Sequence, residues 1–221
     1  MAKAAPTRMA EEPGLDGYGT RDQSQAQRAP GDSPTARVRA DAIKVLGRWA
    51  PPDDRQAALR SSYLTHLHRR GDGADRACVE GHLTASTLVL DPTGRVLLTL
   101  HRRLGRWLQT GGHCEPEDST LQAAALREAE EESGIVGLRL SRCPVLLDRH
   151  LVPCAGPGTA VPHLDVQYVA YAQPGSVERR SGESHDLRWF APRELPEVDA
   201  SVRALVAAAL ASRDLDLGPD T

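Results

Sequence analysis

The segment at residues 127–134 constrains this chain most, because it carries four glutamates within eight residues of one predicted helix. At about 100° per residue, Glu128, Glu131 and Glu132 share an arc of about 100° on one helix face, whereas Glu130 points elsewhere. Carboxylates on one face repel each other, so this face must meet either solvent or a cation. An acidic run taken alone favours the solvated surface.

Two neighbouring features favour the cation. Arg127 lies four residues before Glu131 and can orient its carboxylate, and Gly111-Gly112 precedes the helix at a fitting distance. Oxygen ligands on a small rigid patch suit Mg²⁺ or Mn²⁺, which keep several waters and also bind substrate phosphates. The sequence therefore predicts a divalent-cation site on this helix.

The acidic helix itself is predicted from Ser119 to Ser133. Ser119 and Gln122 have the spacing of a capping box, and Gly134 stands where a helix stop belongs. A final helix with an apolar stripe is predicted at residues 200–211.

The surrounding residues predict a mixed sheet. The apolar, β-branched stretch His82–Leu90 and the stretch Arg95–Leu100 flank the turn sequence Asp-Pro-Thr-Gly, which is typical of a hairpin. Further strands are expected at residues 106–110, 138–151, 163–172 and 186–190. Mixed strands with few helices favour an α+β fold in which helices and sheet form α/β/α layers.

The N-terminal part of the chain differs from the rest. Residues 1–35 are rich in Pro, Gly, Asp, Gln and Arg and poor in large apolar side chains, so disorder is expected. Helical patterns at 36–49 and 53–70, separated by two prolines, predict a helical hairpin packed on the main domain. The expected organisation is a disordered tail at 1–35, a helical extension at 36–80, the main domain at 81–214 and a short tail at 215–221.

Charge and composition limit the partners. A net charge of −3 gives no general attraction to nucleic acid, so a large nucleic-acid partner is not expected. No apolar run approaches the roughly 18–20 residues that cross a bilayer, and no secretory signal is recognisable, so we expect a cytoplasmic protein without a membrane partner. The cysteines show no C-x-x-C pair and no zinc-ribbon spacing; they are Cys78, Cys114, Cys143 and Cys154.

The residues from Gly112 to Ile135 resemble the Nudix box, Gly-x5-Glu-x7-Arg-Glu-U-x-Glu-Glu-x-Gly-U, in which U is apolar. The second half matches position for position, as Arg-Glu-Ala-Glu-Glu-Glu-Ser-Gly-Ile. In the first half, Asp118 stands at the place of the first Glu, and eight residues rather than seven separate it from Arg127. We interpret this as a one-residue insertion, with Asp118 or Glu117 in the place of the supporting acid.

The resemblance extends over about residues 81–211 and implies a Nudix fold. It also implies hydrolysis of a nucleoside diphosphate linked to another group, or of a related organic diphosphate, with Mg²⁺ or Mn²⁺ as cofactor. The implied catalytic residues are Arg127, Glu128, Glu131 and Glu132. The implied metal ligands are the Gly112 carbonyl and the carboxylates of Glu128, Glu131, Glu132 and a later acid.

That later acid is expected in the loop before the strand at 186–190, where Glu183 ranks ahead of Asp186. One of the glutamates or this acid would serve as general base. Substrate phosphates need positive partners, which can pair with them in bidentate fashion. The candidates lie in the loop before the glycine pair and are Arg102, Arg103 and Arg106.

Two histidines and an aspartate are further candidates for substrate binding. His163 and Asp165 alternate along one predicted strand and therefore face the same side, and His113 directly follows the glycine pair. Since a lone histidine is more often packed or structural than catalytic, His113 and His163 are predicted only to line the pocket.

Alternatives to a nucleotide hydrolase stay open at this point. The same site could process a prenyl or modified-sugar diphosphate in specialised metabolism. A non-catalytic Nudix-like ligand sensor is a third hypothesis, but such sensors usually lose box glutamates, and all three are present here. The expected partner is a small-molecule diphosphate, and a homodimer through the N-terminal helices is left open.

Overall fold

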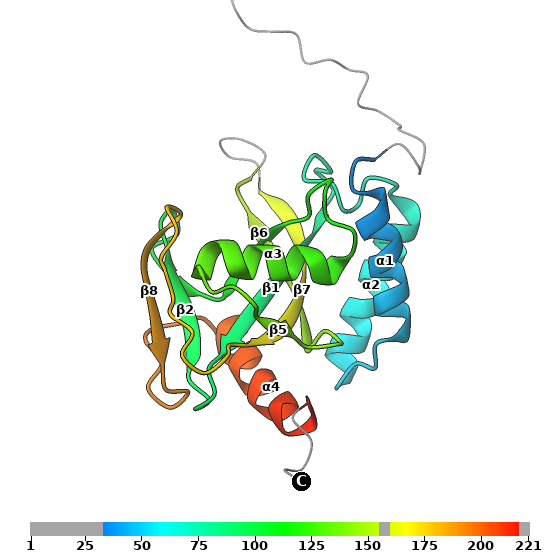
Figure 1. Cartoon of the computed structure of the whole chain (residues 1–221). Helices are drawn as coiled ribbons and strands as arrows, with labels where there is room; N and C mark the ends of the chain where they lie inside the picture. Colours follow the sequence, from blue (N-terminus) through cyan, green and yellow to red (C-terminus); the bar gives the residue numbers. More distant parts are fainter. Residues whose placement is uncertain (1–32, 155–159, 217–221) are drawn as a thin grey trace, which may run out of the picture.

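The computed structural model describes residues 33–154 and 160–216 of the 221-residue chain (Figure 1). Most of the disordered tail predicted at 1–35 lies outside these ranges, as does most of the predicted tail at 215–221.

Within these ranges, a mixed sheet of eight strands forms the centre of the molecule. β1 pairs in parallel with β7 over its whole length, and its other edge is shared by β4 near its start and β2 at its end. The other pairs in the sheet are antiparallel. The strands are β1 (His82–Leu90), β2 (Val96–His101), β3 (Trp107–Leu108), β4 (Thr110–His113), β5 (Arg139–Leu140), β6 (Leu146–Val152), β7 (Val161–Tyr171) and β8 (Ser184–Phe190).

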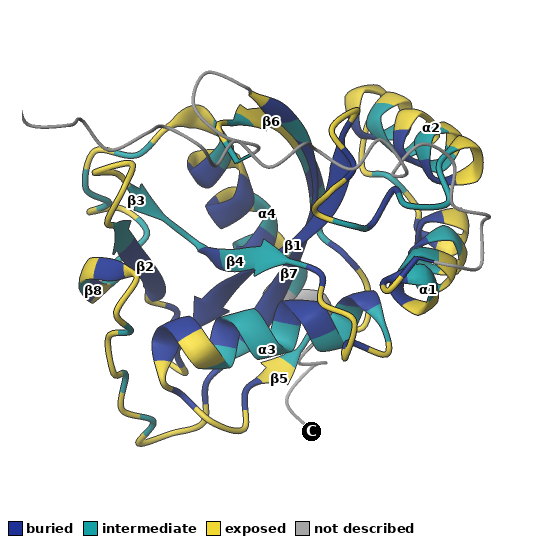
Figure 2. Cartoon of the chain, turned by 90° about the horizontal axis from the view of Figure 1, so that it is seen from above, coloured by how far each residue is buried: buried dark blue, intermediate teal, exposed yellow. Residues whose placement is uncertain are grey.

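Helices cover both faces of this sheet. α3 (Leu121–Ser133) and α4 (Ala200–Asp216) lie on opposite sides of it (Figure 2). Alternate residues of β1 serve the two layers, because Leu88 packs in one cluster with α4 and Ala85 in another with α3. The predicted α+β fold with α/β/α layers is confirmed. None of the described helices is long and apolar enough to span a bilayer.

Several predicted boundaries differ from the structure. The strand predicted at 138–151 is two strands, since Pro144 cannot donate to a ladder and Ser141 bonds across to the Val169 N–H instead. The acidic helix is capped by Thr120, one residue after the predicted cap. The Thr120 hydroxyl accepts a hydrogen bond from the Ala123 N–H.

The structure also adds to the predicted elements. β4, which contains the glycine pair, was not predicted as a strand, and α4 continues past the predicted end at Ala211. The predicted hairpin of β1 and β2 is present through Val89 and Leu97, but most of β2 pairs with β8.

The N-terminal helices pack on the main domain as predicted. α1 (Ala36–Arg48) and α2 (Asp54–Arg69) share one apolar cluster with the first half of α3. The buried Gln56 bridges α2 to β6, accepting from the Leu147 N–H at 2.7 Å and donating to the Leu147 carbonyl at 3.0 Å. The Asp41 carboxylate accepts from the Leu121 N–H, which places a negative charge at the positive end of α3.

We expect Gln56→Ala to lower the free energy of unfolding by about 2 kcal/mol, because it removes two hydrogen bonds and leaves buried backbone groups without partners. Urea unfolding of the full chain measures this loss. Thr65→Ala, on the exposed side of the same helix, is the control and should change stability by less than about 0.5 kcal/mol. Equal stability of the two variants would show that the hairpin is not docked through Gln56.

Candidate active site

A close approach of backbone and helix defines the site. β4 pairs with β1, with Gly111 opposite Ser86 and Gly112 opposite Ala85. A Cβ atom at Gly111 would lie 2.4 Å from the Ser86 Cβ, and its φ of 153° is one that residues with side chains rarely adopt. A Cβ at Gly112 would lie 2.5 Å from a Glu128 carboxylate oxygen. Gly111 therefore allows β4 to pair closely with β1, and Gly112 leaves the space that the Glu128 carboxylate of α3 occupies.

Two of the predicted metal ligands turn toward this glycine strand. Glu132 is 8% exposed and accepts a hydrogen bond from the Gly111 backbone, and the Glu128 carboxylate lies beside Gly112. Burial, followed by the negative charges of Glu128 and Glu183, raises the pKa of Glu132 from 4.5 to about 8. Burial also raises the pKa of Glu128, against the lowering effect of Arg127. The site thus concentrates carboxylates where their negative charge is poorly solvated.

Arg127 links the parts of this site. Its guanidinium donates to both oxygens of Asp118, at 3.1 and 3.0 Å, and to Glu128 at 3.0 Å. It also reaches Glu131 at 3.3 Å, as the sequence predicted, and the backbone carbonyl of His113 at 2.9 Å. Glu131 itself is exposed, unlike Glu128 and Glu132. Arg127 therefore orients carboxylates from two directions while it ties α3 to the end of β4.

Of the two acids considered for the supporting position, Asp118 accepts two hydrogen bonds from the Arg127 guanidinium. It is 5% exposed, and its second oxygen also accepts from the Glu115 N–H. Glu117 is exposed. The one-residue insertion before the helix therefore leaves an acid in contact with Arg127.

The loop before β8 brings Glu183 near this site. Its negative charge contributes to the raised pKa of Glu132, and its backbone carbonyl accepts from the Arg102 N–H at 3.1 Å. Asp186, the second candidate for the later acid, instead forms an ion pair with Arg188 at 2.6 Å. Of the two acids, Glu183 is the one whose charge acts on the Glu132 carboxylate.

The predicted phosphate-binding arginines lie in the loop between β2 and β3. Arg102 donates to the Gly182 carbonyl at 3.3 Å, so it lies beside the Glu183 loop. Arg103 and Arg106 are exposed, as is Arg102. Contact with substrate phosphates stays a prediction for all three.

The remaining candidates lie on the other face of the sheet. Since Gly112 turns toward α3, its neighbour His113 points away from it, and its ring lies 5.0 Å from that of His163. Asp165 is 2% exposed and accepts hydrogen bonds from Thr84 and Ser86 of β1, at 3.0 and 2.6 Å. His163 and Asp165 do share one side of β7, as predicted, but away from the carboxylate helix. Their role in substrate binding stays a prediction.

Two further residues of this region were not predicted from the sequence. His82 contacts both His113 and His163, and the Cys154 thiol lies 3.4 Å from a ring nitrogen of His163. The parallel pairing of β1 with β7 places His82 opposite His163. That register, rather than any spacing along the chain, brings these residues together.

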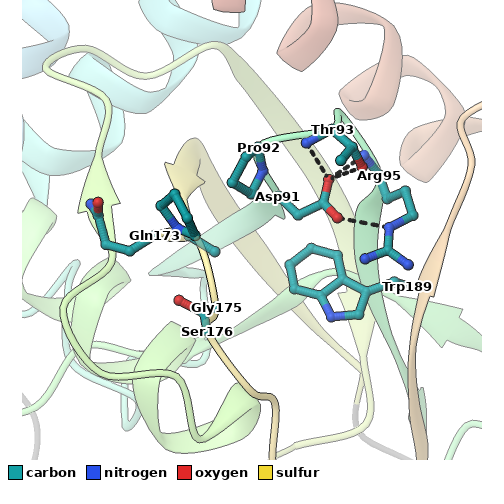
Figure 3. A pocket seen from close by; sticks show the side chains of 10 residues that line it. Asp91, Pro92, Thr93, Arg95, Gln173, Gly175, Ser176 and Trp189 are labelled. Carbon is teal, nitrogen blue, oxygen red and sulfur yellow. Dashed lines mark hydrogen bonds and ion pairs between the residues drawn. The ribbon is translucent and has the colours of Figure 1, made fainter.

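A separate hollow of about 300 Å³ lies at the far end of β1 (Figure 3). Its Asp91 carboxylate is held by Thr93 and Arg95, and the Arg95 guanidinium lies 5.8 Å from the centre of the Trp189 ring. The Asp91 carboxylate is therefore satisfied within the β1–β2 turn.

We expect Asp118→Asn to lower the free energy of unfolding by about 1–3 kcal/mol, because Arg127 loses its most buried anionic partner. Thermal or urea unfolding measures the change. Glu117→Gln is the matched control, one residue away and exposed, and should change stability by less than about 0.5 kcal/mol. Similar losses in both variants would remove Asp118 from the supporting position.

A second prediction concerns Glu132 in metal-free protein. Its folded-state pKa is raised, so the folded protein binds more protons than the unfolded chain between pH 4.5 and 8. The contribution of Glu132 to the free energy of unfolding is fully present below pH 4.5. It is lost as pH rises from 4.5 to 8, by up to about 1.4 kcal/mol per pH unit. The side chain in Glu132→Gln stays neutral. In the presence of chelator, the free energy of unfolding of this variant should therefore increase relative to that of the wild type as pH rises from 5 to 8.

Denaturant unfolding at a series of pH values measures this difference. Glu130→Gln, on another side of the same helix, is the control for the loss of one carboxylate. A difference between Glu132→Gln and wild type that does not vary with pH would contradict the burial of a poorly solvated carboxylate.

Comparison with known proteins identifies the domain. The family described as NUDIX domain matches residues 80–209, which is more than half of the chain. Similar solved structures include a NUDIX-family hydrolase from Clostridium perfringens, with 22% identity, a TM-score of 0.49, and coverage of 60% of this chain and 98% of that one. A MutT NUDIX hydrolase from Burkholderia pseudomallei has 25% identity, a TM-score of 0.47 and coverage of 58% and 97%.

No curated protein matches this chain closely. The match to the family spans the sheet, the glycine strand and the carboxylate helix that the site is built from. The chain therefore belongs to the NUDIX-domain family.

Proposed function

We propose that this protein hydrolyses the diphosphate linkage of a small nucleotide or other organic diphosphate with the help of Mg²⁺ or Mn²⁺. The observation that carries the proposal is the pair of poorly solvated carboxylates, Glu128 and Glu132, held against the glycine strand. The proposed ligands are these two side chains, Glu131, Glu183 and the Gly112 carbonyl.

The chemistry of these groups fits a hard divalent cation. All of the proposed donors are oxygen atoms, which Mg²⁺ and Mn²⁺ prefer. The pKa of Glu132 is raised in part by the charges of Glu128 and Glu183, so the protein concentrates negative charge that a cation would neutralise. Gly112 leaves its carbonyl and the adjacent carboxylate without an intervening side chain.

When bound, such a cation would neutralise the diphosphate and lower the pKa of an attacking water. The chain's own residues supply the rest. Arg127 holds Glu128 and Glu131 in position through 3.0 and 3.3 Å contacts. The exposed Glu131 carboxylate or that of Glu183 is available to accept a proton from water, as a general base requires. Substrate phosphates would meet the exposed arginines of the neighbouring loop, Arg102, Arg103 and Arg106.

The proposal includes a cytoplasmic location and a small-molecule partner. The proposed groups all come from one chain, so the proposal does not require the homodimer. Prenyl and modified-sugar diphosphates remain alternative substrates, since the same donors would serve any diphosphate. The experiment below distinguishes these substrates from nucleotides, and it distinguishes an enzyme from a non-catalytic sensor.

The test is a screen of nucleoside triphosphates, nucleotide sugars, dinucleotides and prenyl diphosphates with Mg²⁺ or Mn²⁺. The measured signal is the release of phosphate or diphosphate. For the best substrate, Glu128→Gln and Glu132→Gln should each lower kcat at least about 100-fold, because each removes a charge from the reacting centre. Glu130→Gln, on the same helix, should retain activity within about twofold.

Wild-type rates in both site variants would contradict the assignment of the carboxylates. Turnover that is indifferent to chelator would contradict the metal requirement. Binding of a diphosphate without any turnover would support the sensor instead.

A further inference from the structure

A second cluster of ligating side chains lies on the sheet face opposite α3. His113 comes from the end of β4, His82 from the start of β1 and His163 from β7, and Cys154 follows the end of β6. One ligating atom from each of the four lies within 4.8 Å of the others. β6 ends beside the start of β7 at one end of the sheet (Figure 1), so residues from three strands and from the segment after β6 converge there.

We propose that His82, His113, Cys154 and His163 form a second metal site, which binds one Zn²⁺ ion and is distinct from the carboxylate site. Three imidazoles and one thiol make a nitrogen and sulfur donor set, which suits zinc and is a poor match for Mg²⁺. Four protein ligands leave no open position, so this site is structural rather than catalytic.

The distances fit a tetrahedral ion. Zn–N bonds of about 2.0–2.1 Å and Zn–S bonds of about 2.3 Å place tetrahedral ligand atoms about 3.3–3.7 Å apart. The Cys154 sulfur lies 3.4 Å from Nε2 of His163 and 4.0 Å from Nε2 of His82. Rings of the three histidines lie 4.8–5.1 Å apart between centroids. Shifts of about 1 Å or less in the side chains would close the set around one ion.

The ring orientations also fit. Nδ1 of His82 lies 3.1 Å from the Cys78 carbonyl and donates to it, which leaves the Nε2 lone pair of His82 directed to the Cys154 sulfur. Metal-bound histidines commonly hold their second nitrogen in this way. Nε2 of His113 is buried without a hydrogen-bond partner among the described residues, a costly state that coordination would relieve.

Burial disfavours the charged form of these histidines. Burial and the neighbouring imidazoles lower the pKa of His113 to about 4 and that of His163 to about 3. Burial likewise lowers the pKa of His82. Neutral imidazoles at physiological pH are able to coordinate zinc without first losing a proton.

A fourth histidine near the cluster is not part of it, and a hollow lies beside the cluster. His150 also contacts His163, but its Nδ1 is bonded to Asp148 at 2.9 Å, which directs it away from the set. A hollow of about 390 Å³, lined in part by His113, Asp75 and Arg76, opens beside the cluster.

The test begins with the zinc content of the full chain, measured by mass spectrometry after reconstitution of chelator-treated protein with Zn²⁺ and removal of excess. Wild type should retain one equivalent. His163→Gln should lower zinc affinity at least about tenfold, since a ligand is lost. The matched controls, His150→Gln and Cys143→Ser, change the same residue types outside the cluster and should retain zinc as wild type does.

Cobalt provides a readout that does not depend on stability or on hydrolysis. Co²⁺-loaded wild type should show the strong visible bands of a tetrahedral ion and a thiolate-to-cobalt charge-transfer band. Cys154→Ser should lose the charge-transfer band, whereas Cys143→Ser should keep it.

Wild type that takes up neither metal would overturn the proposal, as would zinc retention by His163→Gln equal to that of wild type. A charge-transfer band that survives Cys154→Ser would overturn the assignment of the thiol. Loss of hydrolysis in Glu128→Gln with full zinc content would leave this proposal supported, so the two sites are tested separately.

Discussion

The lack of side chains at Gly111 and Gly112 is the constraint on which the rest of the site depends. A single methyl group at either position would collide with Ser86 or with the Glu128 carboxylate. Because Gly112 has no side chain, the Glu128 carboxylate of α3 can lie directly beside this strand. The Gly111 backbone, held close to β1, donates to the buried Glu132. The unusual solvation of these carboxylates is thus a consequence of packing. The glycine strand contributes to this poor solvation as much as the helix that carries the carboxylates.

Alternation along β4 then separates two chemistries. Gly112 turns to the carboxylate helix and the next residue, His113, turns to the opposite face. One face therefore gathers hard oxygen donors and the other gathers imidazole nitrogens and a thiol. Such a division would let a chain discriminate between magnesium and zinc by donor type alone, although its two sites are adjacent along one strand.

The sequence predicted the elements with local signals and missed those that depend on pairing. The helix of box glutamates, its stop at Gly134 and β1 were predictable, because helical period, a left-handed glycine and a β-branched run are local. β4 was not, since two glycines read as a loop until β1 pairs with them. The contact of Asp118 with Arg127 was left open between two acids, as a one-residue insertion changes spacing without revealing which side chain turns inward. The cluster around His82 depends on a register between distant strands, which no spacing encodes.

Arg127 joins these features into one structure. It neutralises Asp118 and Glu128, and the nitrogen that donates to Asp118 Oδ2 also donates to the backbone carbonyl of His113, the residue whose ring belongs to the opposite face. A displacement of β4 by loss of the histidine cluster would therefore change the position of the guanidinium and, through it, of the carboxylates. Asp41 fixes the other end of α3 from the N-terminal hairpin. The helix that carries the proposed chemistry is thus held at its start by the helical extension, which supplies none of the proposed ligands. Along its length it lies against the glycine strand, which supplies the proposed Gly112 carbonyl.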